Sequence, residues 1–290
     1  MRDTSIGSRI FDGINVTILL LFALLTVVPF IHVISSSFAS VANYHESSFL
    51  LIPTEFSLKA YEYIFSTNVL PKSLSVSVFI TITGTVINLL FTSLMAYSLS
   101  RKNVHFRRTI MFMVVFSIIF QGGLIPDYLV VRHLGLIDTF WALMIPRAII
   151  PFYLIILINF FKSLPDEIEE SAKMDGCGDL RLLFQIVMPL SKPALATLTL
   201  FYAVFHWNTY LHAILYITDT EKWPIQVLLR QIVLISQAGL AEGAVEGEQS
   251  IPPDTVRMAV ITVATTPILL VYPFLQKYFA KGIMLGSVKG

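Results

Sequence analysis

Residues 170–177 read Glu-Ser-Ala-Lys-Met-Asp-Gly-Cys, and after eight further residues the chain continues Ile-Val-Met-Pro over residues 186–189. This polar, charged stretch stands between long apolar segments. Pro165 suits a first helical turn, and the acidic residues from Asp166 to Glu170 suit the positive end of a helix dipole. Gly176 can take the positive φ at which such a helix ends. The pattern predicts a short helix that stops at Gly176.

A second short helix is predicted to follow, from Leu180 to Met188, with Asp179 as its N-cap and Pro189 ending or kinking it. In the first helix, Ile168, Ala172 and Met174 give one apolar edge. Two helices joined by a tight turn form a compact knob, which can transmit a rigid push to or from a partner. The other interpretation is an ordinary amphipathic connector that lies on the lipid headgroups.

The composition indicates that a bilayer surrounds most of the chain. Hydrophobic residues make up 55% and charged residues 13%, with a mean hydropathy of +0.74, whereas about a quarter of the residues of a soluble domain are charged. The net charge of +1, without a basic face, argues against nucleic acid as a partner. The single cysteine, Cys177, cannot form an intrachain disulfide. Arg2 and Arg9 precede an apolar run without a small-residue cleavage site, which therefore reads as a first span.

Six segments are long and apolar enough to cross a bilayer, which takes about 20 residues. They are residues 12–37, 73–100, 109–130, 140–162, 193–217 and 256–279. The third is interrupted by Gln121-Gly122-Gly123 and by Pro126, so residues 122–136 could instead form a short re-entrant or interfacial turn. Prolines inside spans predict kinks, because neighbouring helices can satisfy the freed carbonyls; these are Pro29, Pro146, Pro151, Pro267 and Pro273. The sequence predicts an all-α polytopic membrane protein with one transmembrane domain over residues 1–290.

The distribution of lysine and arginine predicts the orientation of the spans. Basic residues collect near both ends of the chain, in residues 101–108 and in residues 162–192. The connecting segments 38–72, 131–139 and 218–255 carry few of them, and the last is acid-rich, with a flexible-looking stretch over 241–247. We therefore expect both termini and the 163–192 loop to be cytosolic and the 218–255 loop to be extracytoplasmic. No clear internal repeat suggests an inverted-repeat secondary transporter.

The motif over residues 170–189 resembles the EAA loop in permease subunits of bacterial ATP-binding-cassette importers. Ser171, Cys177 and Met188 are small or conservative departures, while six residues match in register: Glu170, Ala172, Asp175, Gly176, Ile186 and Pro189. The resemblance implies the type I importer permease fold, in which the 163–192 loop is a cytosolic coupling helix that docks on a separate ATPase. It also implies a multi-pass subunit of the bacterial inner or plasma membrane. The implied partners are a second homologous permease, two ATP-binding subunits that bind ATP and Mg, and an extracytoplasmic solute-binding protein.

The resemblance covers nearly the whole chain and extends to the carbohydrate branch of these importers. Four stretches carry it, at residues 120–126, 134–139, 205–208 and 286–290. Together they are similar to the second permease of oligosaccharide importers, such as the smaller maltose permease. In overall texture the chain resembles importers of acidic polysaccharide fragments such as alginate or pectin pieces. The resemblance implies import of an oligosaccharide by alternating access.

The sequence carries no signature of catalysis. A Gly-rich phosphate loop of the Walker type is absent, so we expect ATP hydrolysis in a partner subunit and no cofactor in this chain. No His, Cys or carboxylate cluster has metal-site spacing, and no nucleophile–base pair stands out, which disfavours an enzyme. The remaining rivals are an importer permease for another solute class, such as an amino acid, phosphate or polyamine, and an ATP-independent secondary carrier. The in-register loop and the lack of buried acidic relays disfavour the carrier.

The fifth predicted span holds candidates for a substrate path. Tyr202, His206 and Tyr210 recur at i, i+4 and i+8 and so would share one helix face, with Trp207 and Asn208 beside them. Aromatic rings, imidazoles and amides suit a sugar, through stacking on C–H faces and hydrogen bonds to hydroxyls. The other interpretation is a polar seam against neighbouring helices, or an aromatic belt at a membrane interface.

Arg147 is a second candidate, because a charge inside a span is costly and usually has a purpose. It lies beside Pro146, several residues inside the fourth predicted span. One hypothesis is that its side chain faces the path and favours an anionic oligosaccharide. The other is that it reaches the outer headgroups or pairs with an acidic residue of an outer loop. Asn88 and Asn159 are interpreted as inter-helix hydrogen-bonding residues.

Overall fold

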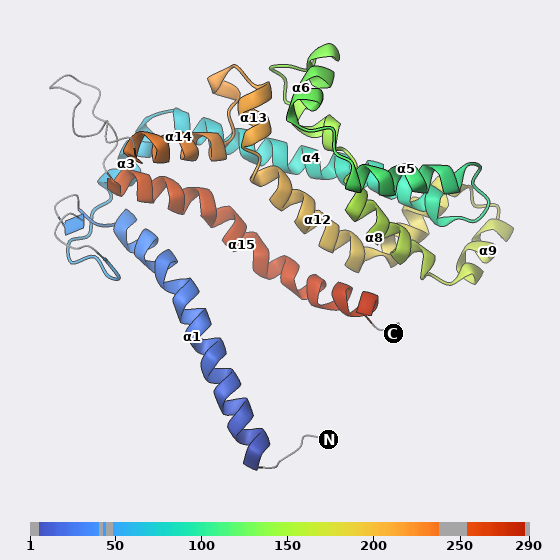
Figure 1. Ribbon diagram of the computed structural model, residues 1–290, viewed down its shortest axis with the longest axis horizontal. Coiled ribbons are helices and arrows are strands. Elements are labelled where there is room, and N and C mark those ends of the chain that lie inside the picture. Colours follow the sequence, from blue (N-terminus) through green and yellow to red (C-terminus); the bar gives the residue numbers. More distant parts are fainter. Residues whose placement is uncertain (1–5, 41–42, 45–48, 238–253, 288–290) are drawn as a thin grey trace. The chain divides into compact units, whose positions relative to one another are not determined.

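A computed structural model describes residues 6–40, 43–44, 49–237 and 254–287 of the chain (Figure 1). The regular structure of these residues is helical, apart from an isolated antiparallel bridge between Ala39 and Phe56. The chain divides into two compact units, each made of two stretches of sequence. The first unit holds residues 1–71 and 229–266, and the second holds residues 72–228 and 267–290.

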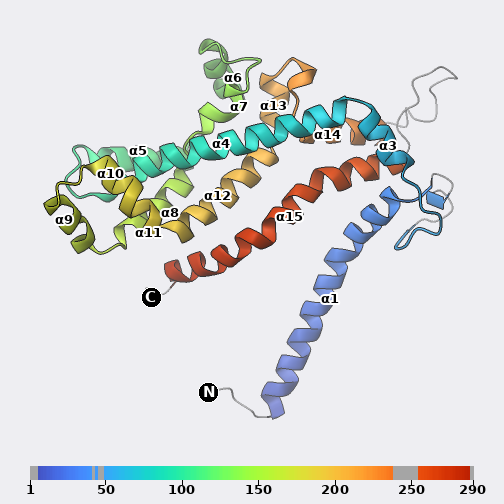
Figure 2. The ribbon, with the colours of Figure 1, turned by 180° about the vertical axis from the view of Figure 1, so that it is seen from behind.

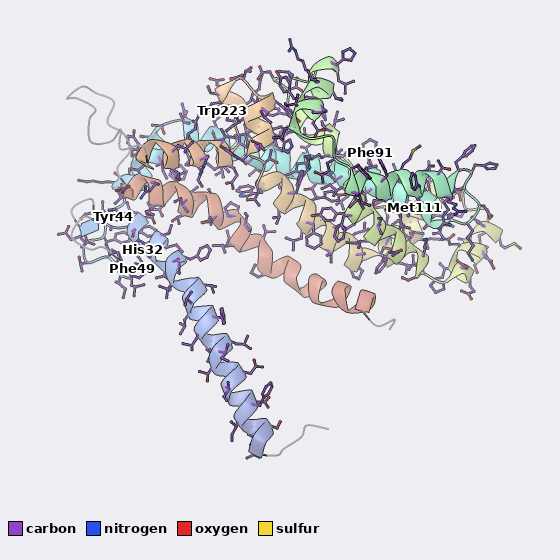
Figure 3. All side chains as sticks on the ribbon, in the orientation of Figure 1. His32, Tyr44, Phe49, Phe91, Met111 and Trp223 are labelled. Carbon is purple, nitrogen blue, oxygen red and sulfur yellow. The ribbon has the colours of Figure 1, made fainter. Side chains whose placement is uncertain are left out.

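The first unit contains α1 (Ile6–Ser37) and α3 (Lys59–Ser66). In the most apolar 18-residue window of α1, no residue is buried within the chain. An apolar helix without a buried side requires lipid or a partner around it. Near its end, the His32 ring stacks on Phe49 with centroids 4.6 Å apart, and its Nδ1 lies 3.0 Å from the Leu50 nitrogen (Figure 3). These contacts fold the segment that follows α1 back onto the helix.

The second unit is a series of helices around α4 (Val69–Ser100), whose first residues belong to the first unit (Figure 2). The helices that follow are α5 (Arg107–Ile119), α6 (Leu124–His133), α7 (Trp141–Met144), the 3-10 helix η1 (Ile145–Arg147) and α8 (Pro151–Lys162). Next come α9 (Asp166–Met174), α10 (Asp179–Leu182), the π-helical turn η2 (Leu183–Val187), α11 (Met188–Leu190) and α12 (Lys192–Trp207). After them come α13 (Leu211–Tyr216) and η3 (Thr220–Lys222), while α14 (Ile225–Gln237) and α15 (Asp254–Ser287) each have residues in both units.

Two apolar clusters form the core of the second unit. One joins the C-terminal half of α4 to α8, α9, η2 and α12, with Leu157, Phe161 and Leu198 fully buried. The other joins the N-terminal half of α4 to α6, α7 and α13, and contains Ile80 and Met144. α4 therefore contributes to both clusters. It can do so because apolar residues occur on all of its sides and along its whole length.

The spans agree with the prediction in part. Among the described residues, three helices are each long and apolar enough to cross a membrane: Gly7–Ser37, Val69–Ser100 and Asp254–Val271. In the same part of the chain, two helix pairs reach this length and hydropathy only when taken together: Trp141–Arg147 with Pro151–Lys162, bent by 51°, and Asp179–Leu190 with Lys192–Trp207, bent by 87°. The third predicted span, 109–130, is not one helix, because α5 ends at Ile119 and Gly123 adopts a φ of +87° before α6.

The predicted outer loop 218–255 contains more structure than expected. Asp219 caps η3 by accepting the backbone N–H of Glu221, and α14 occupies thirteen residues of the segment. The apolar residues of α14 recur every three or four positions, which is helical spacing that the acid-rich composition of the whole segment obscured. The flexible-looking stretch 241–247 lies outside the described residues.

Candidate functional site

α9 forms the first helix predicted from the charged motif. Its first turn is acidic, and it ends in a Schellman motif: the Gly176 N–H donates to the Lys173 carbonyl and the Cys177 N–H to the Ala172 carbonyl, both at 3.0 Å. Gly176 has a φ of +78°, which confirms the positive φ predicted for this position. Apart from its chain neighbours, no described residue has an atom within 4 Å of where a Gly176 side chain would begin.

The second helix of the motif is irregular. Gly178 is the N-cap of α10 and makes no side-chain cap, so the prediction of Asp179 as N-cap is wrong by one residue. Instead of one helix to Met188, the segment passes through the π-helical turn η2, whose face includes the half-buried Ile186, and then α11. The exposed Pro189 lies inside α11, and the chain bends by 87° beyond it, at Ser191. Pro189 and Pro193 flank this bend. Neither has the backbone N–H that would donate a hydrogen bond to continue the helix.

The inner side of α9 is anchored to the rest of the second unit. Ala172 is 7% exposed and packs in the cluster of α4, α8 and α12. Glu169 is buried and forms an ion pair with Arg101, which directly follows α4, and the Arg101 guanidinium lies 4.6 Å from the centre of the Tyr97 ring. Burial raises the pKa of Glu169, whereas the charge of Arg101 lowers it. Sequence reasoning missed this pair, because the two residues lie far apart in the chain.

The outer side of α9 is exposed in the part of the chain that the structure describes. Glu170, Asp175 and Gly176 are exposed, and Met174, predicted to belong to the apolar edge, is 88% exposed. Leu180 is exposed as well. An acidic surface with protruding apolar side chains at its tip is suited to seat in a partner's groove.

The candidates on the fifth predicted span separate into two groups. α12 ends at Trp207, so Tyr210 is not on the same helix as Tyr202 and His206, and the predicted shared face is wrong for it. Tyr202 and His206 are 0% and 1% exposed, and Trp207 is buried as well. The Tyr202 hydroxyl lies 2.7 Å from Thr92 Oγ1 of α4. These buried side chains hold helices together and offer no surface to a sugar.

Asn208 and Tyr210 lie at the break that follows α12. Asn208 is exposed and donates its Nδ2 to the Val204 carbonyl at 2.9 Å, while Tyr210 is half-buried. Both line a groove of about 650 Å³, to which Phe205 and His212 also contribute. Asn208 and Tyr210 are therefore the two candidates of the fifth predicted span whose side chains are accessible from a groove.

Arg147 lies at the break of the fourth span and faces a larger cleft of about 730 Å³. Its Nη2 lies 3.1 Å from His212 Nε2, and its guanidinium lies 5.9 Å from the centre of the Phe205 ring. Gln121 and Asp127 line the same cleft. Among the described residues Arg147 forms no salt bridge, and its guanidinium instead contacts the His212 imidazole and faces the Phe205 ring. The sequence did not indicate that His212 and Phe205 are neighbours of Arg147. It is the break at 208–210 that brings His212 close, and this break has no local signal in the sequence.

The backbone beside Arg147 is fixed by α4. Asn88 donates its Nδ2 hydrogens to the carbonyls of Arg147, at 2.6 Å, and Ala148, at 3.0 Å. This confirms the inter-helix role predicted for Asn88. The contact leaves the Arg147 backbone held while its side chain reaches into the cleft.

Comparisons with known proteins place this geometry among transport proteins. Residues 5–285 match the family described as "Binding-protein-dependent transport system inner membrane component". The Bacillus subtilis (strain 168) polygalacturonan/rhamnogalacturonan transport system permease protein YtcP is 57% identical over 284 residues, which are 98% of this chain and 99% of that protein. Protein LplC of the same organism is 49% identical over 291 residues, covering 100% of this chain and 98% of that one. A solved structure of a bacterial ABC transporter involved in the import of the acidic polysaccharide alginate aligns with a TM-score of 0.87 and 34% identity, over 96% of this chain and 100% of that one.

Proposed function

Because this chain belongs to the family of binding-protein-dependent transport system inner membrane components, we propose that it imports acidic oligosaccharides through the Arg147 cleft. The membership confirms the permease resemblance seen in the sequence, and with it the all-α membrane permease fold and a role in carbohydrate transport. The chain is thus a transport subunit.

The Arg147 side chain carries the proposal of an acidic substrate. A guanidinium binds a carboxylate through two parallel hydrogen bonds, which a neutral sugar cannot accept in the same way. Here the guanidinium is exposed to a cleft, and Phe205, over whose ring it lies, also lines that cleft. Relatives named for polygalacturonan and for alginate transport support the same substrate class.

The exposed side of α9 supports a role as the coupling helix. Glu170 on the exposed side of α9, with Asp175 and Gly176 on the turn after it, would enter a groove of an ATPase, and Ala172 anchors the helix from behind. The bend of 87° that follows Ile186 and Pro189 would carry a movement of α9 into α12. The proposed assembly contains a second homologous permease, two ATP-binding subunits that hydrolyse ATP, and an extracytoplasmic binding protein. Both termini and α9 would then face the cytosol of a bacterial cell.

Transport by the reconstituted assembly tests the substrate class. Arg147→Ala should lower uptake of trigalacturonate at least tenfold, because a charge-assisted pair contributes about 1.5–3 kcal/mol, and should spare uptake of the neutral maltotriose. Arg132→Ala, which removes an exposed arginine of α6 outside the cleft lining, should change neither. Equal losses for the acidic and the neutral sugar would reject selection by charge.

A further inference from the structure

α4 connects the two functional regions of the second unit. It is a single helix from Val69 to Ser100, and Arg101 directly follows its last residue. Arg101 contacts α9, whereas Asn88, in the same helix, contacts the backbone of the Arg147 cleft. Arg101 follows Asn88 by thirteen positions, which correspond to roughly 20 Å along the helix.

The contact at the α9 end is specific. Glu169 is buried and Arg101 is half-buried, and the ring of Tyr97, in the last turn of α4, stacks below the guanidinium. A second ion pair in the same place, Lys102 with Asp166, is 3.8 Å long and both of its side chains are strongly exposed. Exposed pairs hold a helix weakly, whereas a buried charge that loses its partner is costly. The Arg101–Glu169 pair therefore fixes α9 to the end of α4.

The contact at the other end is polar and continuous with the cleft. Asn88 holds the carbonyls of Arg147 and Ala148, and Thr92, one turn farther along α4, bonds the Tyr202 hydroxyl. That hydroxyl also lies 3.4 Å from the backbone nitrogen of Ile150. A shift or rotation of α4 thus acts directly on residues 147–150, which carry the Arg147 side chain.

We propose that Arg101 and Glu169 are positioning residues that clamp α9 to α4, so that movement of α9 reaches the Arg147 cleft through α4. The inference rests on the proposed coupling role of α9 and adds the path by which its movement is transmitted. A helix transmits a displacement along its axis because its hydrogen-bonded backbone is stiff.

The test measures the ratio of sugar imported to ATP hydrolysed in the full assembly reconstituted into liposomes, with trigalacturonate and maltotriose as probes. Arg101→Glu and Glu169→Arg should each lower this ratio at least fivefold. The double exchange, which restores an opposite-charge pair, should recover at least half of the loss. Lys102→Glu, which makes the same charge change one residue away at an exposed position, should leave the ratio within a factor of two of the wild type.

Glu169→Gln provides a variant of nearly unchanged shape in case the charge reversals do not fold. It should also lower the ratio, because a glutamine does not hold the guanidinium as an ion pair. A ratio equal to that of the wild type in Glu169→Gln, or no recovery in a double exchange that assembles normally, would overturn the proposal. An equal loss in Lys102→Glu would overturn it as well.

A pull-down of the ATP-binding subunits separates this proposal from the coupling role on which it rests. If the Arg101 and Glu169 variants keep these subunits bound and still import less sugar per ATP, the clamp is supported. If even Met174→Asp and Gly176→Pro leave binding, hydrolysis and import unchanged, then α9 is not the coupling helix. The same ratio measured with the neutral probe keeps the result independent of the preference for acidic sugars.

Discussion

His206 of α12 donates its Nε2 hydrogen to Oδ1 of Asn88 in α4, with 2.5 Å between the two atoms. The direction follows from the other bonds of Asn88, because its amide hydrogens go to the carbonyls of Arg147 and Ala148 and leave the oxygen as an acceptor. One asparagine thus joins α4, α12 and the break of the fourth span. A buried amide with all its partners in place fixes one arrangement of these segments.

Gly84→Ala tests how closely α4 and α12 must approach for this bond. A Cβ at Gly84 would lie 2.5 Å from His206 Nε2, and the His206 ring is buried and cannot move aside. We expect the variant to lose about 1–3 kcal/mol of stability, as in other overpacked cores, with a lower midpoint of thermal unfolding in detergent. Gly13→Ala is the control, since Gly13 lies in α1 with nothing within 4 Å of a Cβ. A Gly84→Ala protein as stable as Gly13→Ala would contradict the close approach.

The local features of the fold could be predicted from the sequence. The apolar stretch over 73–100 predicted most of α4, and the Asp175-Gly176 pair predicted where α9 ends. In each case the information lies within a few neighbouring residues. Hydropathy and a residue that favours positive φ act locally, so their signal does not depend on the rest of the fold.

The tertiary features could not be predicted in this way. The apolar run continues from α12 into α13 without a proline or glycine at residues 208–210, so the break there and the position of Tyr210 had no local signal. The Arg101–Glu169 pair and the Arg147–His212 contact join residues that only the packing of helices brings together. Their geometry depends on long-range contacts, and a single sequence does not specify which charges meet.

Gly176→Ala tests the turn at the end of α9. The φ of +78° at Gly176 costs a residue with a Cβ about 1–2 kcal/mol, so α9 should end differently and sugar uptake should fall several-fold. Gly178→Ala is a matched control two residues away, because its position is equally open but has a φ of −74°.

Gly176→Pro should have the stronger effect, since proline fixes φ near −65° and cannot donate to the Lys173 carbonyl. It should uncouple transport without abolishing membrane insertion. Normal uptake by Gly176→Pro would refute the role of this turn.

Asp138 joins the segments that follow α6 and α13. Its Oδ1 accepts the backbone N–H groups of Thr218, at 3.1 Å, and Asp219, at 3.0 Å, and its Oδ2 lies 3.2 Å from Lys222 Nζ. Asp138 also has a φ of +63°, a conformation that Asp and Asn tolerate better than most residues. The bonds from Asp219 and Lys222 hold the pKa of Asp138 below its ordinary value, and Asp138 raises the pKa of Lys222.

Variants of Asp138 should show that the stability provided by the Asp138 contacts depends on pH. A lowered carboxyl pKa contributes stability that is complete above the ordinary value of 3.8 and is lost as the pH falls through the lowered pKa. At pH 7 we expect the unfolding temperature to decrease from wild type to Asp138→Asn, which keeps the acceptor and loses the charge, and further to Asp138→Ala, which loses both. The difference between wild type and Asp138→Asn should shrink as the pH falls below 3.8, because the carboxyl then binds a proton more readily in the unfolded wild type than in the folded one. Thermal unfolding measured from pH 7 to pH 3 checks this. A difference in unfolding temperature between wild type and Asp138→Asn that stays constant over the whole range would contradict a role for the Asp138 charge.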